Sequence, residues 1–170
     1  LHKLLAQALA HDAHVDASEQ ARHWDLSGES ERAVAAYEKA AQGALDALAF
    51  VRAAQLSSRA LELLEAQRDQ RYAGLLVVRA HALSCAGRSG EAAAVYARAA
   101  GLTDGEQRVR LQSSAANQLM LSGQVGPGLL AAREVLAQLG VSLPLGTRGA
   151  LLRFVWGRLC HALLGSRFGA

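Results

Sequence analysis

The residues best suited to bind a metal ion lie near the start of the chain. His11 and His14 are three residues apart, and Asp12 and Asp16 lie beside them. Two imidazoles at this spacing can reach one zinc ion, and carboxylates are common further ligands. No cysteine, third histidine or His-Glu-x-x-His motif accompanies the group. We therefore expect a polar loop and no metal site.

Side chains that could perform catalysis are scattered through the sequence. His23 and His81 are single histidines within helical patterns, where packing and surface roles are commoner than proton transfer. The spacing joins no serine, histidine and aspartate into a set. The motifs Gly-x-x-x-x-Gly-Lys-Ser/Thr, Gly-x-Gly-x-x-Gly and His-Arg-Asp are absent from the sequence. The sequence thus predicts no catalytic residue, no cofactor and no enzyme activity for this chain.

The elements that position the polar side chains are predicted to be repeated pairs of short helices. In residues 86–100, small and aromatic residues follow a glycine at helical spacing. Glycine, alanine, tyrosine and alanine occur twice at relative positions 0, +5, +9 and +12: Gly28, Ala33, Tyr37 and Ala40, and then Gly87, Ala92, Tyr96 and Ala99. The glycine ends one helix, and the residues after it form the buried face of the next. This recurrence predicts a helical-repeat protein.

Two weaker copies extend the pattern. One turns at Gly123, with Gly128 and Val135 at +5 and +12, and the other turns near Leu48 and lacks the glycine. Before the glycine turns, alanines lie at −7 and large apolar residues at −4: Ala21 and Trp24, Ala80 and Leu83, Ala116 and Leu119. The turns at 28, 48, 87 and 123 are 20, 39 and 36 residues apart. The first interval is too short for a whole repeat, so we expect one long helix over residues 30–47 to serve two neighbouring pairs.

Composition favours helices throughout. The chain is 51% hydrophobic but only 5% aromatic, and alanine and leucine supply the excess. No run of valine and isoleucine has the length and flanking turns of a strand. The uncharged stretch 111–132 contains too many polar residues for a transmembrane helix. We expect an all-α solenoid of eight or nine helices, with repeats over 1–140 and a connector and C-terminal helix over 141–170 in the same domain.

Positive charge is concentrated at the C-terminal end. Residues 1–134 carry fourteen basic and fifteen acidic residues, whereas four arginines and no acidic residue come after Glu134. The repeat body is therefore close to neutral, which argues against direct binding of nucleic acid. Cys85 and Cys160 fall within helical patterns, and we expect buried thiols without a disulfide. A reducing, cytoplasmic location is consistent with that expectation.

The last predicted helix, about residues 150–164, is more hydrophobic than the others. Arg153, Phe154, Trp156 and Arg158 form its candidate docking surface. Such a helix can cap the last repeat or dock on the rest of a longer chain, since terminal repeats must cover apolar surface. It can also pair with a second copy as a homodimer, or lie on an anionic membrane surface. Capping or docking is the interpretation that we favour.

The spacing of glycine, alanine, aromatic residue and alanine resembles the tetratricopeptide repeat over most of residues 15–140. This resemblance implies helix–turn–helix units stacked in a right-handed superhelix. Residues 21–64 are similar to the helical-repeat region of large bacterial signalling proteins that join a serine/threonine protein kinase domain to a signal-transduction ATPase domain, and residues 139–168 are similar to the segment after the repeats in those proteins. The resemblance implies a parent protein that binds ATP and phosphorylates proteins. None of that machinery lies in this sequence.

In stacked helix pairs, the first helix of each pair lines a concave face where such proteins bind their partners. The phase of the repeat places on this face Ser18, Arg22, Asp25, His81, Ser84, Cys85, Arg110, Ser113, Asn117 and Met120. Arg110 and Asn117 together can hold a carboxylate by charge-assisted hydrogen bonds. We therefore expect a regulatory module that binds a protein, a peptide or another domain of its parent chain. The alternative is the sensor arm of an ATPase-type transcription regulator, which would bind a small molecule in a closed apolar pocket.

Overall fold

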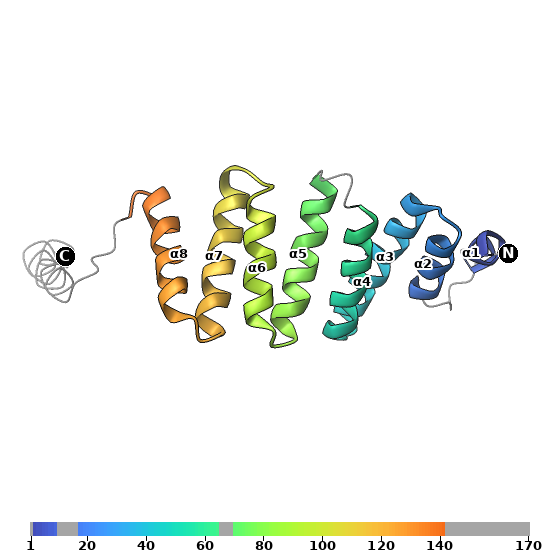
Figure 1. Cartoon of the computed structure of the whole chain (residues 1–170), viewed down its shortest axis with the longest axis horizontal. Coiled ribbons are helices and arrows are strands. Elements are labelled where there is room, and N and C mark those ends of the chain that lie inside the picture. Colours follow the sequence, from blue (N-terminus) through green and yellow to red (C-terminus); the bar gives the residue numbers. More distant parts are fainter. Residues whose placement is uncertain (1, 10–16, 65–69, 142–170) are drawn as a thin grey trace, which may run out of the picture. The chain divides into compact units, whose positions relative to one another are not determined.

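The computed structural model describes residues 2–9, 17–64 and 70–141, and these ranges contain eight helices and no strand. The helices are α1 (His2–Leu9), α2 (Ala17–Leu26), α3 (Ser30–Asp46), α4 (Phe50–Leu63), α5 (Gln70–Cys85), α6 (Ser89–Ala100), α7 (Gly105–Leu121) and α8 (Val125–Gln138) (Figure 1). Residues 1–135 form one compact unit, and residues 136–170 form a second, of which only 136–141 are described. The described part of the chain is therefore all-α, as predicted.

Helices that are neighbours in the sequence are also neighbours in space. From α1 to α7, each helix packs against the next (Figure 1). Helix α3 also packs against α5. Alanine dominates these contacts, because its small side chain allows two helices to approach closely. Larger side chains fill the remaining space, and Val34, Tyr72, Leu76 and Leu83 are almost fully buried. The core is thus a continuous cluster of mostly small residues that extends from each helix to the next.

A residue with left-handed backbone conformation lies at each of the four predicted turns. The φ angles are 77° at Gly28, 58° at Leu48, 75° at Gly87 and 83° at Gly123. At every turn, the N–H of the following residue donates to the carbonyl oxygen five positions before it, at distances from 2.7 to 3.1 Å. This bond is characteristic of the Schellman ending of a helix. Because the same turn recurs four times, the predicted turns are confirmed, including the one without glycine.

Residues that share a place in the repeat are buried alike. Five residues after the turns lie Ala33, Ala53, Ala92 and Gly128, twelve residues after them lie Ala40, Ala60, Ala99 and Val135, and seven before them lie Ala21, Ala41, Ala80 and Ala116. All twelve of these residues are buried. The long helix predicted over residues 30–47 is α3, which packs against both α2 and α4 and so serves two pairs.

Part of the prediction falls on residues outside the described ranges. These residues are His11, Asp12, His14, Asp16, Cys160 and the proposed docking residues Arg153, Phe154, Trp156 and Arg158. Cys85 is described, and it is exposed rather than buried as predicted, because it is the last residue of α5 and adjoins the turn. None of the described helices is both long enough and apolar enough to cross a bilayer.

Candidate functional site

Asp25, one of the predicted partner-binding residues, connects three helices. Arg59 of α4 donates from Nε and Nη2 to its two carboxylate oxygens at 2.7 and 3.1 Å, and the Tyr37 hydroxyl of α3 donates to Oδ2 at 3.2 Å. The hydrogen bonds to Asp25 raise the pKa of Arg59. Burial, followed by the charge of Asp25, raises the pKa of Tyr37. The Asp25 carboxylate is therefore engaged in holding α2 to α3 and α4.

A second contact joins α5 to α7. Gln118 Nε2 donates to Ser84 Oγ at 2.6 Å. The Gln118 side chain is only 7% exposed, and its Oε1 atom has no hydrogen-bond partner among the described residues. Ser113 and Asn117 lie exposed on the same helix, α7. The structure thus brings Ser84 against the helix that carries four other predicted partner-binding residues, Arg110, Ser113, Asn117 and Met120.

Three more of the predicted residues, Arg110, His81 and Arg22, lie near the surface. Arg110, predicted to hold a partner's carboxylate, forms an exposed ion pair with Glu106 of its own helix at 2.6 Å. His81 Nε2 lies 3.6 Å from the Cys85 thiol, also within one helix. Arg22 is exposed on α2. These side chains are accessible, but no contact among the described residues gathers them into one site.

The predicted surface divides into two groups because α3 is shared by two helix pairs. Counting turns along the sequence treats α2, α5 and α7 as equivalent first helices. The structure instead links α2 to α4 through Asp25, and α5 to α7 through Ser84. Arg71 of α5 in turn donates to Glu38 of α3 at 2.9 Å. Side-chain contacts therefore join alternate helices. They group α2 with α4, and they group α5 with α3 and α7.

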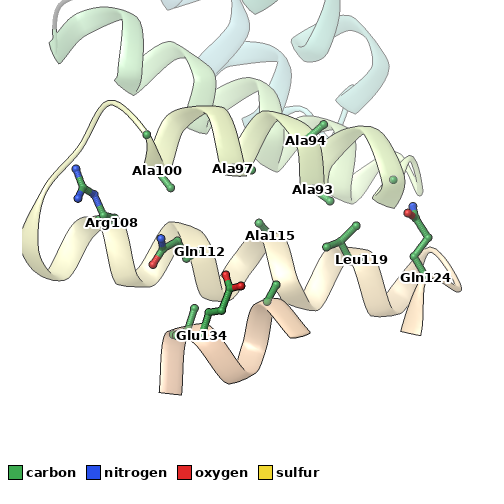
Figure 2. A pocket seen from close by; sticks show the side chains of 14 residues that line it. Ala93, Ala94, Ala97, Ala100, Arg108, Gln112, Ala115, Leu119, Gln124 and Glu134 are labelled. Carbon is green, nitrogen blue, oxygen red and sulfur yellow. The ribbon is translucent and has the colours of Figure 1, made fainter. Parts of the chain in front are cut away.

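A groove that the sequence did not predict lies between α6, α7 and α8 (Figure 2). Its volume is about 750 Å³. The residues that line it are Gly90, Ala93, Ala94, Ala97, Ala100, Gly101, Arg108, Gln112, Ala115, Leu119, Gln124, Ala131, Glu134 and Val135. More than half of them are glycine or alanine, whose side chains extend no further than Cβ. These small side chains leave the space between the helices open.

The α6 wall of the groove is a second alanine face of that helix. Ala92, Tyr96 and Ala99 form the buried face that the repeat pattern predicts. Ala94 and Ala97 are exposed and line the groove. A helix with alanine on two sides can bury one of them in the core and leave the other for a ligand. This extra alanine face is the signal in the sequence that could have located the groove.

The polar side chains of the groove differ in whether they have partners. Arg108 donates to Asp104 Oδ1 and to the Thr103 carbonyl oxygen, both at 2.7 Å. Gln112 is half-buried, and its Oε1 atom has no hydrogen-bond partner in the described part of the chain. Glu134 is exposed and forms no ion pair within the described ranges, and Figure 2 shows its carboxylate directed toward the groove. The arginine is thus engaged, whereas two acceptors remain unmatched by the described residues.

The fold and this site define an all-helical unit with a largely apolar groove between its last three described helices. No group of three or more histidine, cysteine, aspartate or glutamate side chains that could hold a metal ion occurs in the described part of the chain. Comparisons with protein-family models, with curated proteins and with solved structures found no match. The groove is therefore the feature from which a function can be inferred.

Proposed function

We propose that this chain is a non-catalytic interaction module that binds a segment of a peptide or protein in the groove between α6, α7 and α8. The size and lining of the groove support this most strongly: about 750 Å³, mostly small apolar side chains, and a few polar groups. On binding, the apolar side chains of a segment would pass from water into the groove. This burial contributes about 25 cal/mol to the binding free energy for each Å² of apolar surface. The few polar groups would then fix the orientation of the segment.

A right-handed, tetratricopeptide-like superhelix is the architecture that we propose for the repeats. Its support comes from the four like turns and from the buried small residues at equivalent places after each of them. Repeat proteins of this kind present extended binding surfaces, because each unit contacts only its neighbours. Binding at the last units would leave Arg22, Ser113 and Asn117 available for further contacts.

The parent protein that we propose is a larger cytoplasmic bacterial signalling protein, a serine/threonine protein kinase with an ATPase domain. The similarity of residues 21–64 to the helical region of such proteins supports this assignment. In that setting the bound segment belongs either to a separate protein or to another domain of the same parent chain. Occupation of the groove would change the activity of the linked catalytic domains.

A small-molecule sensor is the second candidate. The volume of about 750 Å³ falls within the range of roughly 300–1,000 Å³ that is common for small-molecule sites. The apolar lining would then hold an apolar compound, as expected for the sensor arm of an ATPase-type transcription regulator. A peptide that binds with its side chains in the groove, and that no small molecule displaces, favours the peptide-binding function over the small-molecule sensor.

Selection of binding peptides tests the proposed function. A displayed library of random peptides of about 16 residues is selected against the whole chain and against two variants. Ala97→Trp fills the groove, whereas Ala35→Trp places the same side chain at an exposed position of α3 outside it. We expect peptides that bind the wild-type chain and Ala35→Trp equally and bind Ala97→Trp about tenfold more weakly or worse. Enriched peptides that bind all three proteins equally, or no enrichment at all, would contradict the proposal. Circular dichroism confirms that both variants are folded.

A further inference from the structure

We infer that the segment bound in the groove is an apolar helix that carries one basic side chain, and that this side chain lies beside Gln112 and Glu134. This partner chemistry rests on the proposed function, because it concerns the same groove. Two features of the described residues carry it: an acceptor without a donor and a carboxylate without a cation.

Gln112 supplies the acceptor without a donor. Its Oε1 atom is buried and has no partner among the described residues, although the side chain lines the groove. Folded proteins rarely leave a buried oxygen of this kind unmatched, because it has lost its bonds to water. A ligand that brings an N–H group into the groove would satisfy it. Lysine and arginine carry only donors, whereas an ionised carboxylate carries none.

Glu134 supplies the carboxylate without a cation. It forms no ion pair within the described ranges, and its side chain is directed toward the groove (Figure 2). The arginine of the lining, Arg108, is already held by Asp104 and by the Thr103 carbonyl oxygen. An acidic ligand would therefore meet Glu134 without a free cation from this lining to offset the repulsion. A basic side chain would instead form a charge-assisted hydrogen bond with Glu134.

The rest of the groove favours apolar side chains. From Ala97 and Ala115 toward Leu119, the residues that line it carry no charge (Figure 2). At Gln124 the groove is bounded by Gly90, where a β-carbon would lie 3.7 Å from Gln124 Nε2. An amphipathic helix can place larger apolar side chains between the alanines of such a groove, at the spacing of its own turns. Its basic residue then lies at the opposite end.

A double-mutant cycle on the selected peptides tests this inference. Each enriched peptide is synthesised with its basic residue and with norleucine in its place, and binding is measured by fluorescence anisotropy. The proteins are the wild-type chain, Glu134→Gln, and Glu19→Gln as an exposed control on α2. We expect norleucine to weaken binding about tenfold to wild type and to Glu19→Gln, but less than about threefold to Glu134→Gln. Gln112→Leu should weaken binding of the basic peptides and leave the norleucine peptides unaffected.

The possible failures can be told apart. Enriched peptides without a basic residue, or a norleucine effect of equal size in wild type and Glu134→Gln, would overturn the inference and leave the proposed function intact. A library that yields no peptide sensitive to Ala97→Trp would overturn both. A norleucine effect that is lost in Glu134→Gln and kept in Glu19→Gln would show coupling between the basic residue and Glu134. It would support both the inference and the proposed function.

Discussion

Gly128 of α8 lies so close to Met120 of α7 that no side chain fits between them. A β-carbon on Gly128 would come within 2.5 Å of Met120 Cγ, 3.0 Å of the Met120 backbone nitrogen and 3.1 Å of the Ala116 carbonyl oxygen. The methionine side chain can rotate away, but the two backbone atoms cannot. This contact fixes α8 on α7, and it therefore positions the wall of the groove that carries Glu134.

Gly128→Ala should lower the free energy of unfolding by about 1–3 kcal/mol, because the added methyl group overpacks this contact. Gly126→Ala is the matched control on the same helix, since no atom of the described residues lies within 4 Å of its added β-carbon. It should leave the free energy of unfolding unchanged or raise it by up to about 1 kcal/mol. Urea denaturation followed by circular dichroism measures both. Equal losses in the two variants would argue against the close contact.

Leu48→Gly should stabilise the chain by up to about 1 kcal/mol, because it relieves backbone strain. Leu48 has a φ angle of 58° and is 72% exposed, so it bears the strain of a left-handed conformation with little burial in return. Gly87→Ala is the opposite change at an equivalent turn, and it should destabilise the chain by about 1 kcal/mol through φ alone, since no described atom lies near the added β-carbon. Thermal melting compares the two variants. A loss of stability in Leu48→Gly would mean that the leucine side chain contributes more than its strain costs.

Arg59→Met should lower the free energy of unfolding by about 1 kcal/mol, since it leaves the Asp25 carboxylate, whose side chain is 15% exposed, without its bidentate partner. The arginine itself is 47% exposed, which limits the effect through solvent screening. Arg110→Met provides the control, because its ion pair with Glu106 is exposed on both sides and should contribute almost nothing. Denaturation at low salt measures the difference. Equal effects of the two variants would show that the Asp25 contact is no stronger than a surface pair.

Alkaline pH should destabilise the fold through Tyr37 and Tyr96. Burial raises the pKa of both phenols above the ordinary value of about 10, with the nearby Asp25 and Cys85 charges as further causes. Because the folded state then holds these protons more tightly than the unfolded chain, their contribution is complete below about pH 10 and is lost as the pH rises through the folded-state pKa values. Melting temperatures from about pH 9 to about pH 11.5 should fall less steeply for Tyr37→Phe and Tyr96→Phe than for wild type. Identical slopes in all three proteins would contradict the assignment.

The turns and the buried positions of this fold were predictable because each has a local chemical requirement. A left-handed backbone conformation favours glycine, and glycine marks three of the turns. Closely packed helices also need small residues at fixed sequence distances from each turn. The turn at Leu48 agrees with that phase even without the glycine. The pattern also predicted the long helix α3. It did not predict how this shared helix groups the helices that carry the predicted binding residues. The side-chain contacts of Asp25 run from α2 to α3 and α4, whereas that of Ser84 runs from α5 to α7.

The repeat pattern does not predict the groove as a whole, although the second alanine face of α6 marks one of its walls. Its walls come from three helices, and periodicity within one helix shows only which side is buried. The unmatched Oε1 of Gln112 and the absence of an ion pair at Glu134 within the described ranges are properties of the folded chain, since both depend on the groups that other helices bring near. From the sequence alone, each of them reads as an ordinary polar residue on a helix.

Chemical-shift mapping tests the central claim most directly. The ¹⁵N-labelled chain is titrated with an unlabelled peptide from the selection, and the amide shifts are followed. Binding in the groove predicts that the largest changes occur in α6 to α8, at Ala94, Ala97, Gln112 and Glu134. Largest changes at the exposed residues Arg22, His81 and Asn117, with the groove amides unmoved, would contradict it and return the binding site to the faces that the repeat pattern indicates.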